Sequence, residues 1–194
     1  MKKLNENHVL KTVSIVFLSL LALFLIIAIV LTIKNYNKRF YKLDIDYENN
    51  SVVDLTNKLP MSDEIGKNYN GVGVEKGIAE YKKITITNKN KAKVNYEIYL
   101  TKIHKEEKDI RSNYIKLYLT DEKNNPIKGF NKKQVISYYD LLSLNDKPGS
   151  KLLYSGSLAN DESDTFILRS WVADTYLLSN EEESFEFNID IRMK

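Results

Sequence analysis

The stretch YKKITITNKNKAKVNYEIYL, residues 81–100, decides the fold of this chain. In residues 84–87, and again in residues 94–100, apolar side chains alternate with side chains that are mostly polar. A period of two residues is typical of a β-strand that buries one face and exposes the other. Between the two runs, the Asn-Lys-Asn-Lys sequence at residues 88–91 is a turn signal. The stretch therefore predicts two antiparallel strands joined as a hairpin.

Comparable runs on both sides of this stretch predict further strands. Turn-forming residues separate the runs at intervals of about 8–15 residues, as in all-β domains. We therefore expect a mainly β fold, an Ig-like antiparallel β-sandwich that extends over residues 43–194. The further predicted strands are residues 43–47 (LDIDY), 52–55 (VVDL), 115–119 (IKLYL), 152–158 (LLYSGSL), 165–172 (TFILRSWV) and 185–191 (FEFNIDI).

Two segments within this domain predict other structures. In residues 134–144 the apolar positions 135, 138, 139 and 142 follow the i, i+3, i+4, i+7 spacing of one helix face, which predicts a short helix. Residues 59–77 contain Pro60 and several glycines and predict a long loop. The glycines with GxGxxxG spacing precede a predicted strand and not a helix, which favours turn formation over phosphate binding.

An uncharged apolar stretch lies near the N-terminus: TVSIVFLSLLALFLIIAIVLTI, residues 12–33. As a helix it would span about 33 Å, close to the thickness of the hydrocarbon core of a bilayer. Its only polar side chains are small hydroxyls, which can bond within their own helix. The sequence therefore predicts a tail at residues 1–11, a transmembrane helix at 12–33, a juxtamembrane segment at 34–42 and the β domain at 43–194.

The orientation of this helix does not follow from charge counts, because both of its flanks are basic. A short basic region followed by an apolar run is typical of a secretory signal, and a long C-terminal domain can be translocated despite nearby positive charge. The run is longer than a usual cleaved signal and lacks a site of small residues. We therefore expect an uncleaved signal anchor with a cytoplasmic tail and an extracytoplasmic domain.

Aromatic and basic residues interleave directly after the predicted span. Aromatic rings favour the depth of the lipid headgroups, and basic side chains reach the lipid phosphates. These residues therefore predict membrane-interface anchors, although Phe40 and Tyr41 could instead open the first strand. The predicted anchors are Tyr36, Lys38, Arg39, Phe40 and Tyr41.

Composition excludes several classes of function. The net charge of +3 arises from interspersed charges of both signs, so no nucleic-acid partner is expected. The chain has no cysteine, which excludes disulfides, thiolate metal sites and a cysteine nucleophile. Its richness in Lys, Asn, Ile and Tyr is typical of an AT-rich bacterial genome.

Motifs for catalysis or metal binding are not found. His104 lies in the sequence HKEEK, which does not have the spacing of a zinc motif, and Ser155 lacks the G-x-S-x-G context of a nucleophile. Arg169 and Trp171 fall on the same face of a predicted strand, where packing of Trp171 in the core is favoured over contact with a partner. We therefore predict no enzyme activity, no catalytic or metal-binding residue and no cofactor.

Several short motifs resemble those of Gram-positive surface proteins that carry an Ig-like β-sandwich. These motifs are LPMSDEIG at residues 59–66, ITITN at 84–88, YEIYL at 96–100, LYSGSL at 153–158 and FILRSWVAD at 166–174. Together they are similar, at a distance, to the camelysin and TasA group of biofilm-matrix proteins. The resemblance implies an exported structural domain that sometimes polymerises and, for camelysin, a peptidase activity. The chain departs from the group in lacking a recognisable signal-peptidase site and an Asn-x-Phe-x-Ala-Gly-like start of a mature chain.

These features predict a single-pass, membrane-anchored bacterial surface protein whose β-sandwich is a structural or protein-interaction module of the cell envelope or extracellular matrix. The expected partners are the lipid bilayer and other envelope or matrix proteins. Strand addition is the expected mode of binding if residues 81–88 form an exposed sheet edge. Two alternatives stay open: a membrane-anchored hydrolase similar to the camelysin peptidase, and a subunit of a membrane complex with a cytoplasmic β domain.

Overall fold

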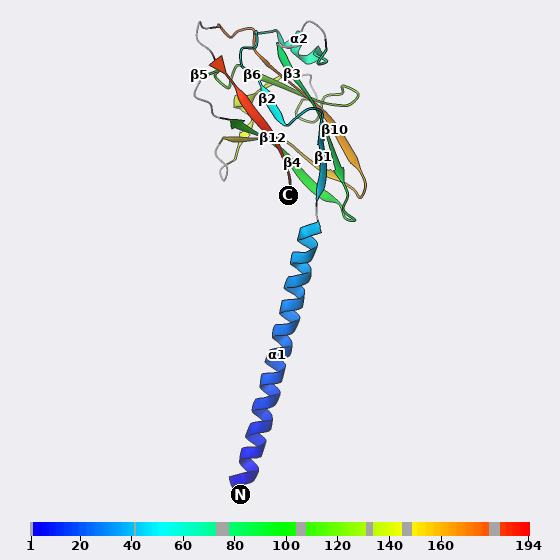
Figure 1. Cartoon of the computed structure of the whole chain (residues 1–194), viewed down its shortest axis with the longest axis vertical. Helices are drawn as coiled ribbons and strands as arrows, with labels where there is room; N and C mark the ends of the chain where they lie inside the picture. The colour runs from blue at the N-terminus through cyan, green and yellow to red at the C-terminus, as the bar shows by residue number, and fades with distance from the viewer. Residues whose placement is uncertain are drawn as a thin grey trace. The chain divides into compact units, whose positions relative to one another are not determined.

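The computed structural model describes residues 2–40, 42–72, 78–103, 108–130, 134–144, 149–178 and 183–194, with only the backbone for residues 2–10 and 34–40. The chain forms two compact units, Met1–Lys42 and Leu43–Lys194 (Figure 1).

The first unit is one helix, α1 (Lys2–Phe40). Its segment Lys11–Ile33 has a mean hydropathy of 3.2 and buries none of its surface within the protein. Inside this segment the hydroxyl groups of Ser19 and Thr32 donate to the carbonyl oxygens of Val16 and Ala28, so they are satisfied by the helix itself. The helix is therefore long and apolar enough to span a membrane.

The second unit is mainly β and is built from two five-stranded antiparallel sheets. The first sheet consists, in order, of β1 (Leu43–Tyr47), β3 (Ala79–Asn88), β10 (Ser163–Val172), β6 (Ile115–Asp121) and β7 (Ile136–Ser137). The second consists of β2 (Val52–Asp54), β12 (Glu186–Met193), β4 (Val94–Ile103), β9 (Ser150–Leu158) and β8 (Leu142–Ser143). A two-residue parallel pair, β5 (Lys108–Asp109) with β11 (Glu183–Ser184), completes the described strands.

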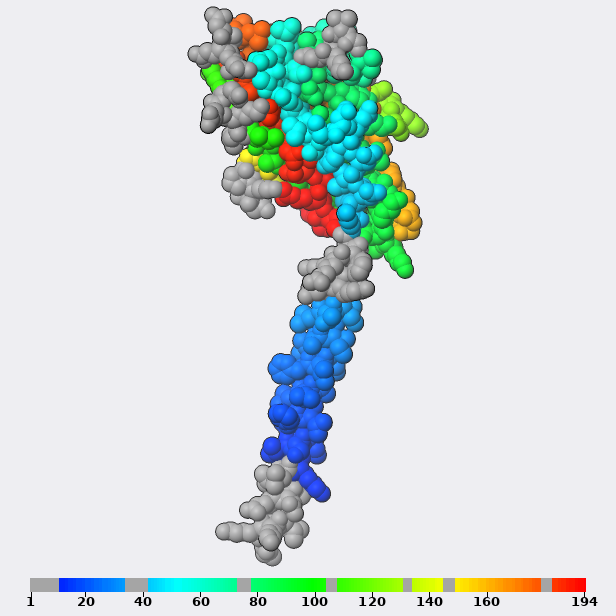
Figure 2. Space-filling model, viewed as in Figure 1, coloured from blue at the N-terminus to red at the C-terminus, as the bar shows by residue number. Residues whose placement is uncertain are grey.

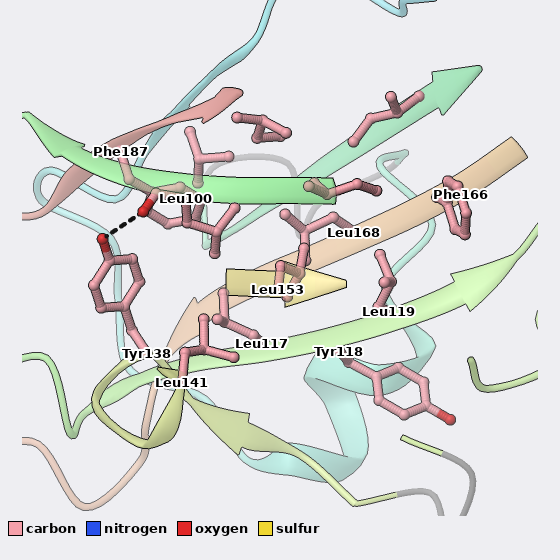
Figure 3. Close-up of a cluster of buried hydrophobic side chains, with 14 of the residues drawn as sticks. Leu100, Leu117, Tyr118, Leu119, Tyr138, Leu141, Leu153, Phe166, Leu168 and Phe187 are labelled. Carbon is pink, nitrogen blue, oxygen red and sulfur yellow. Dashed lines mark hydrogen bonds between the residues drawn. The ribbon is translucent and has the colours of Figure 1, made fainter. Parts of the chain in front are cut away.

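A single hydrophobic core lies between the two sheets. Leu100 and Phe187 contribute to it from the second sheet, and Leu117 and Leu168 contribute from the first (Figure 3). On β4, every second side chain from Val94 to Leu100 is buried in the core, as the alternation in the sequence predicts. The predicted mainly β, antiparallel fold is confirmed, while its Ig-like relationship stays a prediction.

The last strand in the chain occupies an interior position. β12 pairs with β2 on one side and with β4 on the other. In Figure 2 the red surface of β12 accordingly lies beside the cyan surface of the first strands. Residues near the two ends of the domain are therefore neighbours in the second sheet.

The predicted hairpin of residues 81–100 is wrong. β3 pairs with β1 and β10, whereas β4 pairs with β9 and β12, so the chain crosses from one sheet to the other between these strands. The same pairing makes β3 an interior strand, so residues 81–88 are not an exposed edge. Alternation shows which face of a strand is buried, but the partner strand depends on residues elsewhere in the chain.

The side chain of Asn88 holds this crossing together. Its Nδ2 donates to the carbonyl oxygens of Ala92 (2.9 Å), Leu158 (3.1 Å) and Ala159 (2.9 Å). Its Oδ1 accepts from the backbone N–H of Asn90 at 2.9 Å. Asn88 and Leu158 are fully buried and Asn90 is nearly so, so water cannot readily replace the bonds of Asn88 to the carbonyl oxygen of Leu158 and to the N–H of Asn90.

Substitution of Asn88 by alanine is therefore expected to destabilise the sandwich by about 2–4 kcal/mol, because it leaves several buried polar groups unsatisfied. Urea unfolding of the detergent-solubilised full chain, followed by circular dichroism, measures this change. Asn95→Ala, at an exposed asparagine of β4, is the matched control and should change stability by less than about 0.5 kcal/mol. Equal effects of the two substitutions would contradict the role assigned to Asn88.

The predicted helix at residues 134–144 is also wrong. The segment forms β7, a single 3₁₀ turn at Tyr138–Asp140 and β8. Tyr138 is buried and its hydroxyl donates to the carbonyl oxygen of Leu100, whereas Tyr139 and Leu142 are 66% and 72% exposed. The four apolar positions therefore do not share one face. In so short a run, the helical spacing of apolar residues does not distinguish a helix from other structures.

The predicted loop at residues 59–77 contains a short helix, α2 (Asp63–Asn68). Ser62 caps it, because its side chain accepts a hydrogen bond from the backbone N–H of Ile65. Residues 73–77, with two glycines of the GxGxxxG pattern, lie outside the described residues. Sequence reasoning missed α2 because the surrounding glycines and proline dominated the pattern.

Candidate functional site

The predicted membrane-interface anchors are only partly described. Tyr36, Lys38, Arg39 and Phe40 belong to the backbone of α1, and their side chains are not described. Phe40 therefore ends the helix and does not open the first strand, whereas Tyr41 lies outside the described residues. The role of these residues at the membrane interface stays a prediction.

A polar pocket of about 390 Å³ lies on the outer face of the first sheet, on the side opposite the core. It is formed by α2 and the segment after it, by β6 with the turn that follows, and by β10. The lining residues are Glu64, Lys67, Asn68, Asn70, Tyr118, Thr120, Asn124 and Arg169.

The position of α2 against the sheet depends on Gly66 and Trp171. A Cβ atom at Gly66 would lie 2.3–2.7 Å from atoms of the Trp171 ring, so only glycine allows this close approach. The backbone N–H of Met61 also donates to the carbonyl oxygen of Val172 at 2.9 Å. Together these contacts place one wall of the pocket over β10. Trp171 is fully buried, which confirms the expectation that it packs inside the domain.

Arg169 forms the floor of the pocket and is only 4% exposed. Its Nε donates to the carbonyl oxygen of Tyr69 at 2.6 Å, its Nη1 to Thr120 Oγ1 at 3.1 Å and its Nη2 to Asn124 Oδ1 at 2.6 Å. The guanidinium carbon also lies 5.4 Å from the centre of the Tyr81 ring, in a cation–π arrangement. Three chain segments therefore meet at one arginine.

The turn that supplies Asn124 is fixed by its own contacts. Asn124 has a φ of 62°, in the left-handed region that asparagine tolerates. Asp121 Oδ1 accepts from the backbone N–H groups of Lys123 and Asn125, both at 2.8 Å. The turn therefore presents the amide of Asn124 to Arg169 in a set orientation.

The charge of Arg169 has no acidic partner among the described residues. No carboxylate oxygen of these residues lies within ion-pair distance of its guanidinium. Burial lowers the pKa of Arg169, and interaction with Tyr81 and Tyr118 opposes this effect. Because arginine nonetheless stays protonated in proteins, a buried positive charge lies at the base of the pocket. Sequence analysis singled out Arg169 only as a neighbour of Trp171 and missed its role here.

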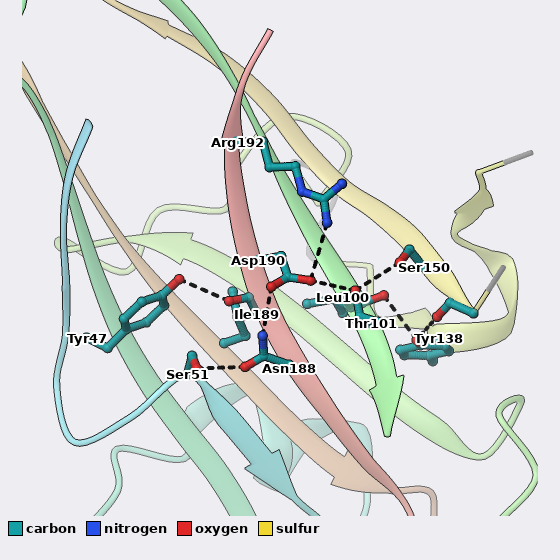
Figure 4. Close-up of polar contacts among 11 residues, drawn as sticks. Tyr47, Ser51, Leu100, Thr101, Tyr138, Ser150, Asn188, Ile189, Asp190 and Arg192 are labelled. Atoms are coloured by element: carbon teal, nitrogen blue, oxygen red, sulfur yellow. Dashed lines mark hydrogen bonds and ion pairs between the residues drawn. The ribbon is translucent and has the colours of Figure 1, made fainter. Parts of the chain in front are cut away.

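A second polar cluster lies on the second sheet around Asp190 (Figure 4). Its carboxylate accepts from Thr101 Oγ1 at 2.7 Å and from Asn188 Nδ2 at 2.8 Å, and it lies 3.7 Å from Arg192 Nη2. Thr101 also bonds to Ser150, and Asn188 accepts from Ser51. The side chains of this cluster satisfy one another, which favours a structural role over ligand binding.

Tyr47 adds a contact between the two sheets beside this cluster. From β1 of the first sheet, its hydroxyl donates to the carbonyl oxygen of Ile189 on β12 of the second at 3.0 Å. Burial, with a smaller contribution from the negative charge of Asp190, raises the pKa of Tyr47 from 10.0 to about 12. The folded state therefore favours the neutral phenol.

Tyr47 is expected to make stability depend on pH in the alkaline range. The contribution of Tyr47 to the free energy of unfolding is complete below pH 10, the pKa of an unfolded tyrosine. This contribution is lost as the pH rises from about 10 to about 12. Tyr47→Phe should cost about 1 kcal/mol at pH 8, through the lost hydrogen bond, and the difference from the parent protein should shrink by pH 11.5. Urea unfolding at both pH values measures this. Tyr139→Phe, at an exposed ring, is the control, and a constant Tyr47→Phe difference would contradict the assignment.

Within the described residues, no group of three or more His, Cys, Asp or Glu side chains could hold a metal ion. The pocket at Arg169 contains one carboxylate, that of Glu64. A hydrolase of the kind left open above would need two converging carboxylates, so the described pocket does not favour that alternative. His104 lies outside the described residues.

Comparisons with known proteins give no match: no protein-family model fits the chain, and no similar sequence is found among curated proteins.

Proposed function

We propose that this protein is a single-pass, membrane-anchored bacterial surface protein whose β-sandwich is a structural or protein-interaction module of the cell envelope or extracellular matrix. Two features support the proposal. α1 contains a 23-residue segment long and apolar enough to cross a bilayer, and a separate compact unit carries the described strands. An anchor joined to a rigid sandwich suits the presentation of a surface to a partner. The relationship to the camelysin and TasA group stays a prediction.

The observation that carries the interaction role is the open edge of β9. β8 pairs with β9 only at Leu152 and Lys151. Beyond these residues, no described strand pairs with the outer edge of β9 over residues 153–157. Ser155 and Ser157 in this stretch are exposed. Unpaired N–H and C=O groups along a sheet edge are a template for an added strand from another chain.

The margin of the first sheet at β6 is better covered. On β6, the two residues of β7 pair with Lys116 and Leu117, and the following turn continues the edge because the backbone N–H of Ile127 donates to the carbonyl oxygen of Leu119. β3, which the sequence suggested as an edge, is flanked on both sides. We therefore propose residues 153–157, and not residues 81–88, as the site of strand addition.

Photocrosslinking tests the interaction role directly. A photoreactive amino acid is introduced at Ser155 or Ser157 of the full chain in intact cells, with Asp161 in the β9–β10 turn as an exposed control position. We expect protein adducts from the two β9 positions and none from the control. The same adducts from all three positions, or none from any of them, would contradict binding at this edge.

The orientation of the domain can be tested with single cysteines, because the chain has none of its own. Lys91→Cys places a thiol at an exposed position between β3 and β4. A membrane-impermeant maleimide should label this variant in intact cells if the domain is extracytoplasmic. Labelling only after lysis would instead support the alternative of a cytoplasmic β domain.

A further inference from the structure

The pocket at Arg169 has hydrogen-bond donors that the described residues leave unused. A guanidinium group has five N–H donors, and the three bonds described above leave two of them without a partner among the described residues. Tyr118 lines the same pocket, and no described residue accepts a hydrogen bond from its hydroxyl. The labelled ring of Tyr118 points away from the core side chains in Figure 3.

Two further side chains add to this donor set. Lys67 lines the pocket from α2, and its ammonium group forms no ion pair or hydrogen bond with the described residues. Asn70 Oδ1 accepts from the backbone N–H of Val72 at 3.0 Å, which leaves the two N–H donors of its amide for the pocket. Donors without a partner therefore come from α2, the segment after it, β6 and β10.

The pocket is positively charged, as a binding site for an anion requires. Arg169 and Lys67 are positive, and Glu64 is the one negative residue in the described lining, so this lining carries a net charge of about +1 at neutral pH. Arg169 is buried, so water screens its charge less than it would at the surface. A buried charge without an opposite charge nearby is costly, and an anion bound from outside would offset that cost.

We propose that this pocket binds a carboxylate group. A planar guanidinium with two remaining N–H donors matches the two oxygens of a carboxylate, and a lining with one net positive charge suits a monoanion better than a dianionic phosphate. The volume of about 390 Å³ leaves space for a small organic acid or for the C-terminal residues of a peptide. The inference holds whichever side of the membrane the domain faces and whether or not β9 binds a strand.

Arginine side-chain NMR offers a direct test, because the chain has four arginines: Arg39, Arg111, Arg169 and Arg192. The full chain is labelled with ¹⁵N-arginine, placed in phosphatidylcholine nanodiscs, and titrated with sodium acetate, sodium sulfate or sodium chloride at constant ionic strength. The Nε–H signal of Arg169 is assigned by its loss in Arg169→Lys. We expect acetate to shift this signal saturably while the other three signals stay in place.

Two peptide arms distinguish the source of the carboxylate. An N-acetylated tripeptide with a free C-terminus is compared with the same peptide carrying a C-terminal amide. If the free-acid peptide binds more tightly than acetate and the amidated peptide does not bind, the preferred ligand is a peptide C-terminus. Equal affinity for the peptide and acetate identifies a free organic acid.

Variants of the lining residues separate binding from a structural role. Lys67→Gln and Tyr118→Phe should weaken acetate binding by about three- to tenfold, since each removes a donor. Glu64→Gln should strengthen it by a similar factor, because it removes a repelling charge. Lys91→Gln and Glu48→Gln make the same chemical changes at exposed positions outside the pocket and should leave the affinity unchanged.

Several results would overturn the proposal. One is a shift of the Arg169 signal that is linear and equal for acetate and chloride. Another is saturation by sulfate without saturation by acetate, which would rule out the carboxylate assignment. A third is equal acetate affinity for the parent protein and for Lys67→Gln, Tyr118→Phe and Glu64→Gln. These three variants keep Arg169, so the test does not depend on Arg169→Lys being folded.

Discussion

Trp171→Ala should lower the free energy of unfolding of the sandwich by about 3–5 kcal/mol, the usual cost of removing a large buried aromatic side chain. Trp171 is fully buried beneath α2, and its ring fills the space next to Gly66. The cavity left by alanine would also remove the support of α2. Since Tyr69, just after α2, accepts a hydrogen bond from Arg169, the pocket should loosen as well. Urea unfolding followed by circular dichroism measures the change in stability.

A double-mutant cycle with Gly66 makes this prediction sharper. Gly66→Ala alone should destabilise the protein by about 1–3 kcal/mol, because the added Cβ would overlap the Trp171 ring. In the double variant that overlap is absent. Its loss of unfolding free energy should therefore be smaller than the sum of the losses in the two single variants. Leu177→Ala, at a side chain that is 87% exposed, is the control. A cost for Trp171→Ala no larger than that of Leu177→Ala would contradict the packing described here.

The second large effect is expected in α1. The double substitution Leu23→Arg with Ile26→Arg places two charges near the centre of the apolar segment. Each charge should raise the free energy of membrane insertion by about 2.5–3.5 kcal/mol. We expect the parent chain to stay in the membrane pellet after alkaline carbonate extraction and the double variant to appear in the supernatant.

The control for this change keeps the helix apolar. Leu23→Val with Ile26→Val retains the hydropathy of the segment and should fractionate like the parent chain. Recovery of the parent chain in the soluble fraction without detergent would contradict a membrane anchor. Retention of the double arginine variant in the pellet would show that another part of the protein holds it there.

Local patterns predicted most strands but not their partners. The alternation in residues 84–87 and 94–100 gave the strands and their buried faces correctly, because a period of two is set by the chain's own geometry. It could not show that Asn88 would take the chain from one sheet to the other. That outcome depends on carbonyl groups at Leu158 and Ala159, about 70 residues away in the chain.

The pocket could not be predicted for the same reason. Its lining joins residues 64–70, 118–124 and 169, and no local spacing connects these segments. One signal was present: an arginine in the apolar run FILRSWV requires buried hydrogen-bond partners if the run forms an interior strand. The sequence could not name Tyr69, Thr120 and Asn124 as those partners.

The interior position of β12 has a consequence for how the domain is made. β2 and β4 are synthesised much earlier than β12. They join the same sheet only when residues 186–193 pair with both of them. Pairings of such high contact order form slowly, and a nascent chain lacking this segment exposes the edge of β4. A truncation before residue 186 would therefore leave an aggregation-prone intermediate and not a smaller stable sandwich.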